Sequence, residues 1–137
     1  MEIKQAWYRI SVKALIYNDK GEFLLCKEDN GVWDLPGGGL DHGENPIECI
    51  KRELLEEMGL EVTHTSEQPK YFITAHEPES KSRPWRANVF YEVKVKNLDF
   101  IPSEECMEIG FFNTETIKDI DVFVNVSELV KQLKEVE

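Results

Sequence analysis

The segment from residue 38 to residue 60 constrains this chain most, because it encodes both a well-delimited helix and an unusual concentration of acidic side chains. Asn45 followed by Pro46 is typical of a helix start, and Gly59 is typical of a helix end. The pattern therefore predicts a helix over residues 46–58. Such a helix packs against the rest of a fold by one apolar face.

The predicted helix places an apolar stripe and an acidic cluster side by side, at about 100° per residue. The apolar stripe is Ile47, Ile50, Leu54 and Met58, and the acidic cluster is Glu53, Glu56 and Glu57. Like charges three or four residues apart on a helix repel each other. A solvated acidic face is the simpler explanation. A divalent cation would instead remove the repulsion, because oxygen-rich sites suit Mg²⁺ and Mn²⁺.

Three consecutive glycines, Gly37 to Gly39, precede the helix and allow the backbone to approach a ligand closely. They do not form a P-loop, because no Gly-Lys-Ser/Thr follows. They do not form a dinucleotide fingerprint either, since His42 stands where its last glycine would be. Taken alone, the glycines favour a plain turn over a ligand site.

Together these residues match the signature of the Nudix hydrolases, G-x5-E-x7-R-E-U-x-E-E-x-G-U, in which U is aliphatic. The signature is complete over 38–60, as Gly38, Glu44, Arg52, Glu53, Leu54, Glu56, Glu57, Gly59 and Leu60. Seven exact matches by chance have odds on the order of 10⁻⁹ per starting point. The sequence therefore resembles the Nudix hydrolase family (MutT-like), and this resemblance outweighs a solvated acidic face.

The resemblance implies an α/β fold, an α/β/α sandwich with a mixed central sheet, built as a single domain over residues 1–137. The order of elements expected from the sequence agrees with it. Strands are expected at 7–17, 22–27, 60–65, 69–75, 86–95 and 108–112, with a short extended piece at 32–36. A brief helix over 115–120 is expected to be capped by Asn113 or Thr114, and a closing helix over 125–136 by Ser127.

The resemblance also implies a metal site. By it, Glu53, Glu56 and Glu57 bind Mg²⁺, for which Mn²⁺ can substitute, and the carbonyl of Gly37 adds a ligand. The cation would neutralise phosphate oxygens and activate water, and a carboxylate would accept the proton of that water. Glu53 is favoured as this base, with Glu56 nearly as suitable.

Two further parts of the site follow from the same resemblance. Arg52 is expected to orient a ligand carboxylate, and Glu44 to support the loop or a water on the ion. Another acid is expected downstream, in a region where Nudix enzymes often carry one. The candidates are Glu104, Glu105 and Glu108, of which Glu105 is preferred, and a plain surface role is the simpler alternative for it.

Candidate substrate contacts lie in two places. Trp33 precedes the glycines and either walls the cleft or packs in the core. Arg83, Trp85 and Arg86 belong to a basic segment, residues 81–86, that surrounds an aromatic ring in an otherwise acidic chain. Such a segment suits a nucleobase and phosphates, and it equally suits an exposed loop or an oligomer contact.

Net charge and cysteine content limit which partners and which cellular compartment are expected for this protein. The net charge is −11, from 27 acidic and 16 basic residues, which argues against a stable nucleic-acid partner or an anionic membrane. Three widely spaced cysteines without a CxxC pair indicate reduced thiols. The sequence shows neither a secretory leader pattern nor a membrane-spanning run. We therefore expect a cytoplasmic protein, with a homodimer left open.

The implied activity is a Mg²⁺-dependent pyrophosphohydrolase. It would cleave a phosphoanhydride bond in a nucleoside diphosphate linked to another moiety, such as a normal or oxidised nucleoside triphosphate, ADP-ribose or a nucleotide sugar. The alternative is a non-catalytic nucleotide-binding or regulatory Nudix domain, whose members generally lose the acids of the signature. The sequence does not choose among these substrates.

Overall fold

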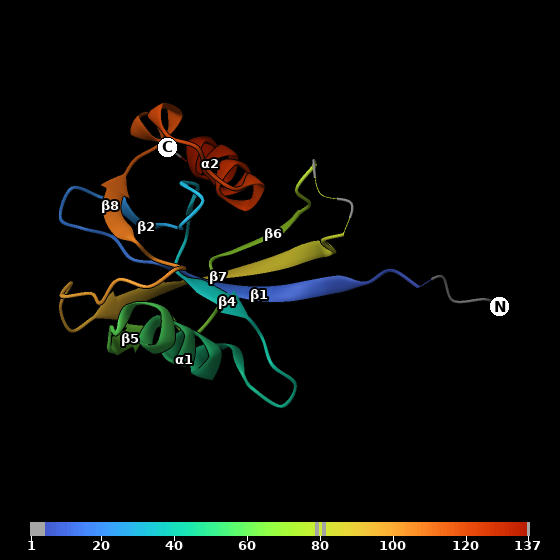
Figure 1. Cartoon of the computed structure of the whole chain (residues 1–137), viewed down its shortest axis with the longest axis horizontal. Helices are drawn as coiled ribbons and strands as arrows, with labels where there is room; N and C mark the ends of the chain where they lie inside the picture. Colours follow the sequence, from blue (N-terminus) through green and yellow to red (C-terminus); the bar gives the residue numbers. More distant parts are fainter. Residues whose placement is uncertain (1–4, 79, 81, 137) are drawn as a thin grey trace.

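The computed structural model describes residues 5–78, 80 and 82–136. Within them the chain alternates strands and helices in an α/β order (Figure 1). The strands are β1 (Tyr8–Leu15), β2 (Phe23–Lys27), β3 (Trp33–Asp34), β4 (Gly37–Gly39), β5 (Val62–Thr65), β6 (Tyr71–Ala75), β7 (Trp85–Val95) and β8 (Glu108–Phe112). The helices are α1 (Pro46–Met58), the 3-10 helix η1 (Thr116–Asp119) and α2 (Val124–Val136).

The larger of two sheets is mixed. β1 runs parallel to β7 and antiparallel to the glycine strand β4. The opposite edge of β7 is shared by β6 and β5, which both pair with it in the antiparallel direction. The smaller sheet is antiparallel, in the order β3-β2-β8. The crossover from β1 to β7 makes the first strand a central one, so its side chains reach both faces of the fold.

The two α-helices cover opposite faces of the sheets, with α1 below and α2 above in Figure 1. One buried cluster joins the α1 face to β1 through residues such as Leu54 and Val12, and a second joins the α2 face to β7 through Leu129 and Phe90. Burying apolar surface on both faces is what holds such a layered domain together. The expected α/β/α sandwich with a mixed sheet is confirmed.

Helix α1 has the limits that the sequence predicts, because its ends are fixed locally. The Asn45 side chain accepts a hydrogen bond from the Glu48 amide at 2.9 Å, and the Glu48 carboxylate accepts one from the Asn45 amide at 3.4 Å. Gly59 ends the helix with a φ of 67°, which favours glycine. Because these two caps fix both ends of α1, they also fix the positions of Glu53 and Glu57 relative to the sheet.

The start of α2 differs from the prediction. The helix begins at Val124, whose amide donates to the Glu77 carboxylate at 2.9 Å. Ser127 is therefore not the cap: it lies in the first turn, where its hydroxyl donates to the Val124 carbonyl at 2.9 Å. Ahead of η1, the Asn113 side chain accepts hydrogen bonds from the backbone amides of Glu115 and Thr116, each at 2.9 Å.

The glycines also take a more regular form than a turn, since Gly37 to Gly39 make strand β4. All three cysteines are buried and carry free thiols, as the sequence predicts. In the part of the chain that the structure describes, no helix combines the length and the apolar character needed to cross a bilayer.

Two adjacent leucines of α1 test this packing. Leu54 is fully buried, whereas 62% of the Leu55 side chain is exposed. We expect Leu54→Ala to lower the free energy of unfolding by about 2–5 kcal/mol, because it leaves a cavity against β1. Leu55→Ala is the matched control and should change it by less than about 0.5 kcal/mol. Equal effects in urea denaturation would contradict the assigned face of the helix.

Candidate active site

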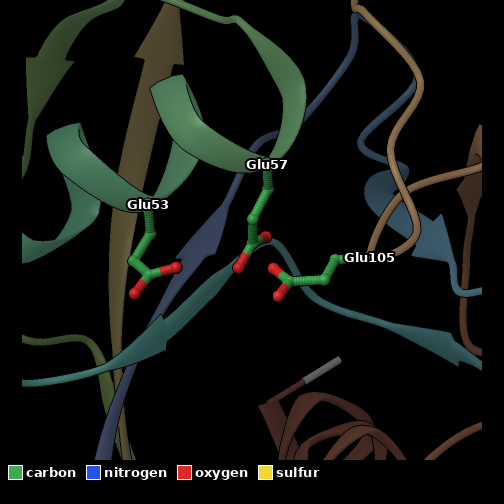
Figure 2. Close-up of side chains that lie close together, drawn as sticks. All are labelled: Glu53, Glu57 and Glu105. Atoms are coloured by element: carbon green, nitrogen blue, oxygen red, sulfur yellow. The ribbon is translucent and has the colours of Figure 1, made fainter.

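Three carboxylates converge where the end of α1 meets the loop before β8. Glu53 and Glu57 come from α1 and Glu105 from the loop, and one carboxylate oxygen of each lies within 4.8 Å of the others (Figure 2). The loop is tied to the helix, since the Ser103 hydroxyl donates to the Glu57 carbonyl at 2.7 Å. Fully buried Cys106 anchors the loop on the other side of Glu105.

The acid cluster, Glu53, Glu57 and Glu105, brings negative charges together that require a proton or a cation between them. Burial, followed by hydrogen bonding with Glu53, raises the pKa of Glu57 well above its usual value of 4.5, although the positive charge of Lys13 opposes this. The cluster therefore holds a proton at neutral pH unless a cation replaces it. An oxygen-only donor set of this kind fits a hard divalent cation such as Mg²⁺ or Mn²⁺.

Strand β4 makes room for these acids because its residues lack side chains. A Cβ atom on Gly38 would lie 2.7 Å from the Glu53 carboxylate, so any larger residue would displace it. Gly37 has a φ of 127° and packs directly on the backbone of β1. Its carbonyl oxygen accepts a hydrogen bond from the Lys13 ammonium at 3.4 Å.

Lys13 is a buried cation that the sequence analysis did not identify. Its ammonium donates to the Asp34 carboxylate at 3.1 Å and to the Leu35 carbonyl at 3.3 Å. Burial alone would lower the pKa of Lys13, but the carboxylates of Asp34 and Glu57 raise it. Lys13 is therefore a fixed positive charge between the acid cluster and the rest of the cavity.

Arg52 organises the acids on the outer side of the helix. Its guanidinium donates to Glu44 at 2.7 and 2.9 Å, to Glu53 at 2.9 Å and to Glu56 at 3.2 Å. This bidentate contact lowers the pKa of Glu44 to about 2. Glu56 stands apart from the acid cluster, because 60% of its side chain is exposed and its carboxylate faces Arg52.

A cavity of about 420 Å³ extends from the acid cluster along the sheet. Arg83 and Arg86, from the basic segment, line its far wall, and Ser11 and Asn88 line it from β1 and β7. Asn125 of α2 also lines the cavity and donates to Asp34 at 3.0 Å. Acidic and basic groups thus face a single space.

The two candidate tryptophans are not among the described residues that line this cavity. Trp33 is buried and packs edge-on against Phe112, with ring centroids 5.1 Å apart. Trp85 is half-exposed and stacks on His76, with centroids 5.2 Å apart. Lys81, in the same basic segment, lies outside the described residues.

The cavity residues that sequence reasoning missed share one signal. Lys13 and Asn88 are polar residues at inward-facing positions of strands, where the alternation otherwise places apolar side chains such as Leu15 and Phe90. A buried polar residue in a central strand requires a partner. A polar residue at an inward-facing position of these strands can be recognised in the sequence, and this signal could have identified both Lys13 and Asn88.

The raised pKa of Glu57 predicts a specific pH dependence of stability in the metal-free protein. Above pH 4.5 the unfolded state loses the proton of Glu57, whereas the folded state keeps it up to its raised pKa. The free energy of unfolding therefore falls as the pH rises from 4.5 toward the folded pKa. We expect Glu57→Gln to be more stable than the wild type by an amount that grows from about pH 5 to about pH 8. Thermal unfolding in the presence of a chelator measures this difference.

Glu61→Gln is the matched control, because Glu61 follows the same helix and 68% of its side chain is exposed. Its stability difference from the wild type should stay constant over the same pH range. A constant difference for Glu57→Gln as well would show that the Glu57 carboxyl is not protonated in the folded protein.

Comparison with curated proteins gives a full-length and a partial relative. Nucleoside triphosphatase NudI from Enterobacter sp. strain 638 is 27% identical over 118 residues, which are 78% of this chain and 84% of that protein. RNA pyrophosphohydrolase from Ruthia magnifica is 45% identical over 60 residues, which are 43% of this chain and 34% of that protein. The match therefore spans about one third of the length of this second relative.

Solved structures share the fold over most of the chain. The MutT protein from Methanosarcina mazei Go1 is 25% identical, with a TM-score of 0.75 and coverage of 97% of both chains. The E. coli ORF135 protein is 19% identical, with a TM-score of 0.75 and coverage of 96% of this chain and 91% of its own. The model of the NUDIX domain matches residues 7–133. The chain belongs to the Nudix domain family.

Proposed function

We propose that this protein is a pyrophosphohydrolase that uses a divalent cation, Mg²⁺ or Mn²⁺, to cleave a phosphoanhydride bond of a small nucleotide. The observation that carries the proposal is the convergence of Glu53, Glu57 and Glu105 within 4.8 Å at one end of a 420 Å³ cavity. Carboxylates so close together repel one another as anions, and a cation that joins them removes this repulsion. The cavity size suits a small-molecule ligand.

In this proposal Glu53, Glu57 and Glu105 hold the ion, with the carbonyl of Gly37 as a further donor. The ion, when bound, neutralises phosphate oxygens and activates water for in-line attack. Glu53 is our candidate for the base on the strength of the Nudix signature, and its carboxylate is held by a hydrogen bond from Arg52 at 2.9 Å against the bare backbone of Gly38. Arg52 holds this carboxylate in place.

Two signature acids outside the cluster have supporting roles in the proposal. Glu44 fixes the Arg52 guanidinium through two hydrogen bonds, so we propose that it acts by positioning Arg52. Glu56 remains a candidate ligand and base on the strength of the Nudix signature alone. Its exposed carboxylate is the partner of Arg52 in the ion-free protein.

A nucleotide is the proposed substrate class for two reasons. The names of the relatives, a nucleoside triphosphatase and an RNA pyrophosphohydrolase, both describe phosphoanhydrides of nucleotides. The net charge of −11 disfavours a long RNA, whose phosphates the surface would repel, and so favours a small substrate. Within the cavity, Arg83 and Arg86 are the proposed contacts for negative charge on the substrate. Trp33 packs in the core and Trp85 stacks on His76, so neither is proposed as a contact within the cavity.

A panel of phosphoanhydrides tests the proposal. Nucleoside triphosphates, oxidised nucleoside triphosphates, ADP-ribose and nucleotide sugars would be incubated with Mg²⁺ or Mn²⁺, and the products identified by mass. We expect at least one to be cleaved between phosphorus atoms, with chelation abolishing turnover. Glu53→Gln and Glu57→Gln should each lower kcat by about 100-fold or more, because each removes a charge that holds the ion.

Glu61→Gln again serves as the control and should retain full turnover, since the Glu61 side chain is exposed and is not among the described residues that line the cavity. Glu56→Gln tests whether Glu56 takes part in the reaction: a loss as large as that of Glu57→Gln makes it a ligand or the base, and a small loss limits it to pairing with Arg52. Nucleotide binding by calorimetry without turnover of any compound would instead favour a non-catalytic, regulatory domain and contradict the proposal.

A further inference from the structure

Asn88, in the middle of β7, is fully buried and has no hydrogen-bond partner for either polar atom of its side chain among the described residues. Buried side-chain amides in folded proteins are almost always paired. An unpaired buried donor or acceptor destabilises the folded state by the desolvation free energy of that group. Asn88 carries one of each, so some other benefit must keep it in the sequence.

The position of Asn88 shows which space its carboxamide faces. It pairs in register with Ser11 of β1 on one side and Ile73 of β6 on the other, so it lies in the interior of the larger sheet. Asn88 lines the same cavity as the acid cluster, as does Arg86 two residues earlier on the same face of the strand. The unpaired amide therefore belongs to the proposed substrate cavity and not to a closed core.

The surroundings suit a ligand that is partly apolar and partly polar. Leu35, Ala75 and Phe123 give the cavity apolar walls, and Ser11 lies beside Asn88. The Arg86 guanidinium donates to the Ser11 hydroxyl at 3.0 Å and so reaches across toward the amide.

We propose that Asn88 is a specificity-determining residue that pairs with the edge of a nucleobase in the substrate. The inference rests on the proposed function and adds which end of the substrate lies on β7. A carboxamide offers a donor and an acceptor side by side, and it pairs with an edge that carries the complementary two groups. Nucleobases carry such edges, whereas a phosphate carries only acceptors and would leave the acceptor of Asn88 unpaired.

The test is ligand binding, which does not depend on turnover. Affinities for the four nucleoside 5′-monophosphates and for ribose 5-phosphate would be measured by calorimetry in Mg²⁺, for the wild type, Asn88→Leu and Asn88→Ala. We expect both variants to bind at least one monophosphate about tenfold or more weakly, because a paired amide is lost. Binding of ribose 5-phosphate, which has no base, should stay unchanged.

Thermal unfolding without ligand adds a second readout. Asn88→Leu removes two unpaired polar atoms and should therefore raise the melting temperature. Asn88→Ala removes the same atoms but leaves a small cavity, so its melting temperature should stay unchanged. Asn125 is a control for stability only: it is also buried but is bonded to Asp34, so Asn125→Leu should lower the melting temperature. These readouts remain available if no phosphoanhydride is hydrolysed.

Two results would overturn the inference. Unchanged affinity for all four monophosphates in either variant would mean that the amide binds only water or serves the fold. An equal loss of affinity for ribose 5-phosphate would mean that the substitution disturbs the cavity in general. Loss confined to ligands with a base, in variants as stable as the wild type, supports the role given to Asn88.

Discussion

Repulsion between three neighbouring carboxylates, the partly buried Glu53 and Glu57 and the exposed Glu105, is the constraint around which this molecule is arranged. Glu53 and Glu57 are fixed on α1, and Glu105 is brought to them by a loop that is bonded to the end of that helix. Without a cation, a proton on Glu57 relieves the repulsion, at the cost of a strongly raised pKa. The fold thus maintains a site that is complete only when a positive charge enters it.

The layered architecture supplies the rigidity that such a site needs. Both faces of the sheet are packed, by α1 on one side and α2 on the other (Figure 1). The central strand β1 carries Val12 into the α1 core and Lys13 into the cavity, so neighbouring residues serve stability and chemistry. Because β4 is made of glycines, the backbone itself forms the wall behind Glu53.

Features set by local sequence could be predicted, and features set by distant contacts could not. The limits of α1 follow from Asn45 and Gly59, which act within one turn of the helix ends. The cap of α2 was mistaken because Glu77, which supplies it, lies 47 residues earlier in the chain. Glu105 was favoured only through the family resemblance. The alternation of β7 could have marked Asn88 as a buried polar residue, but that its side chain has no partner among the described residues follows only from the three-dimensional structure.

The most direct test is to locate the ion. A crystal of the wild-type protein grown with Mn²⁺ would be measured at a wavelength where manganese scatters anomalously. The arrangement described above predicts an anomalous peak at bonding distance from carboxylate oxygens of Glu53, Glu57 and Glu105. A peak bound only by exposed surface acids, with these three side chains turned apart and free of metal, would contradict it.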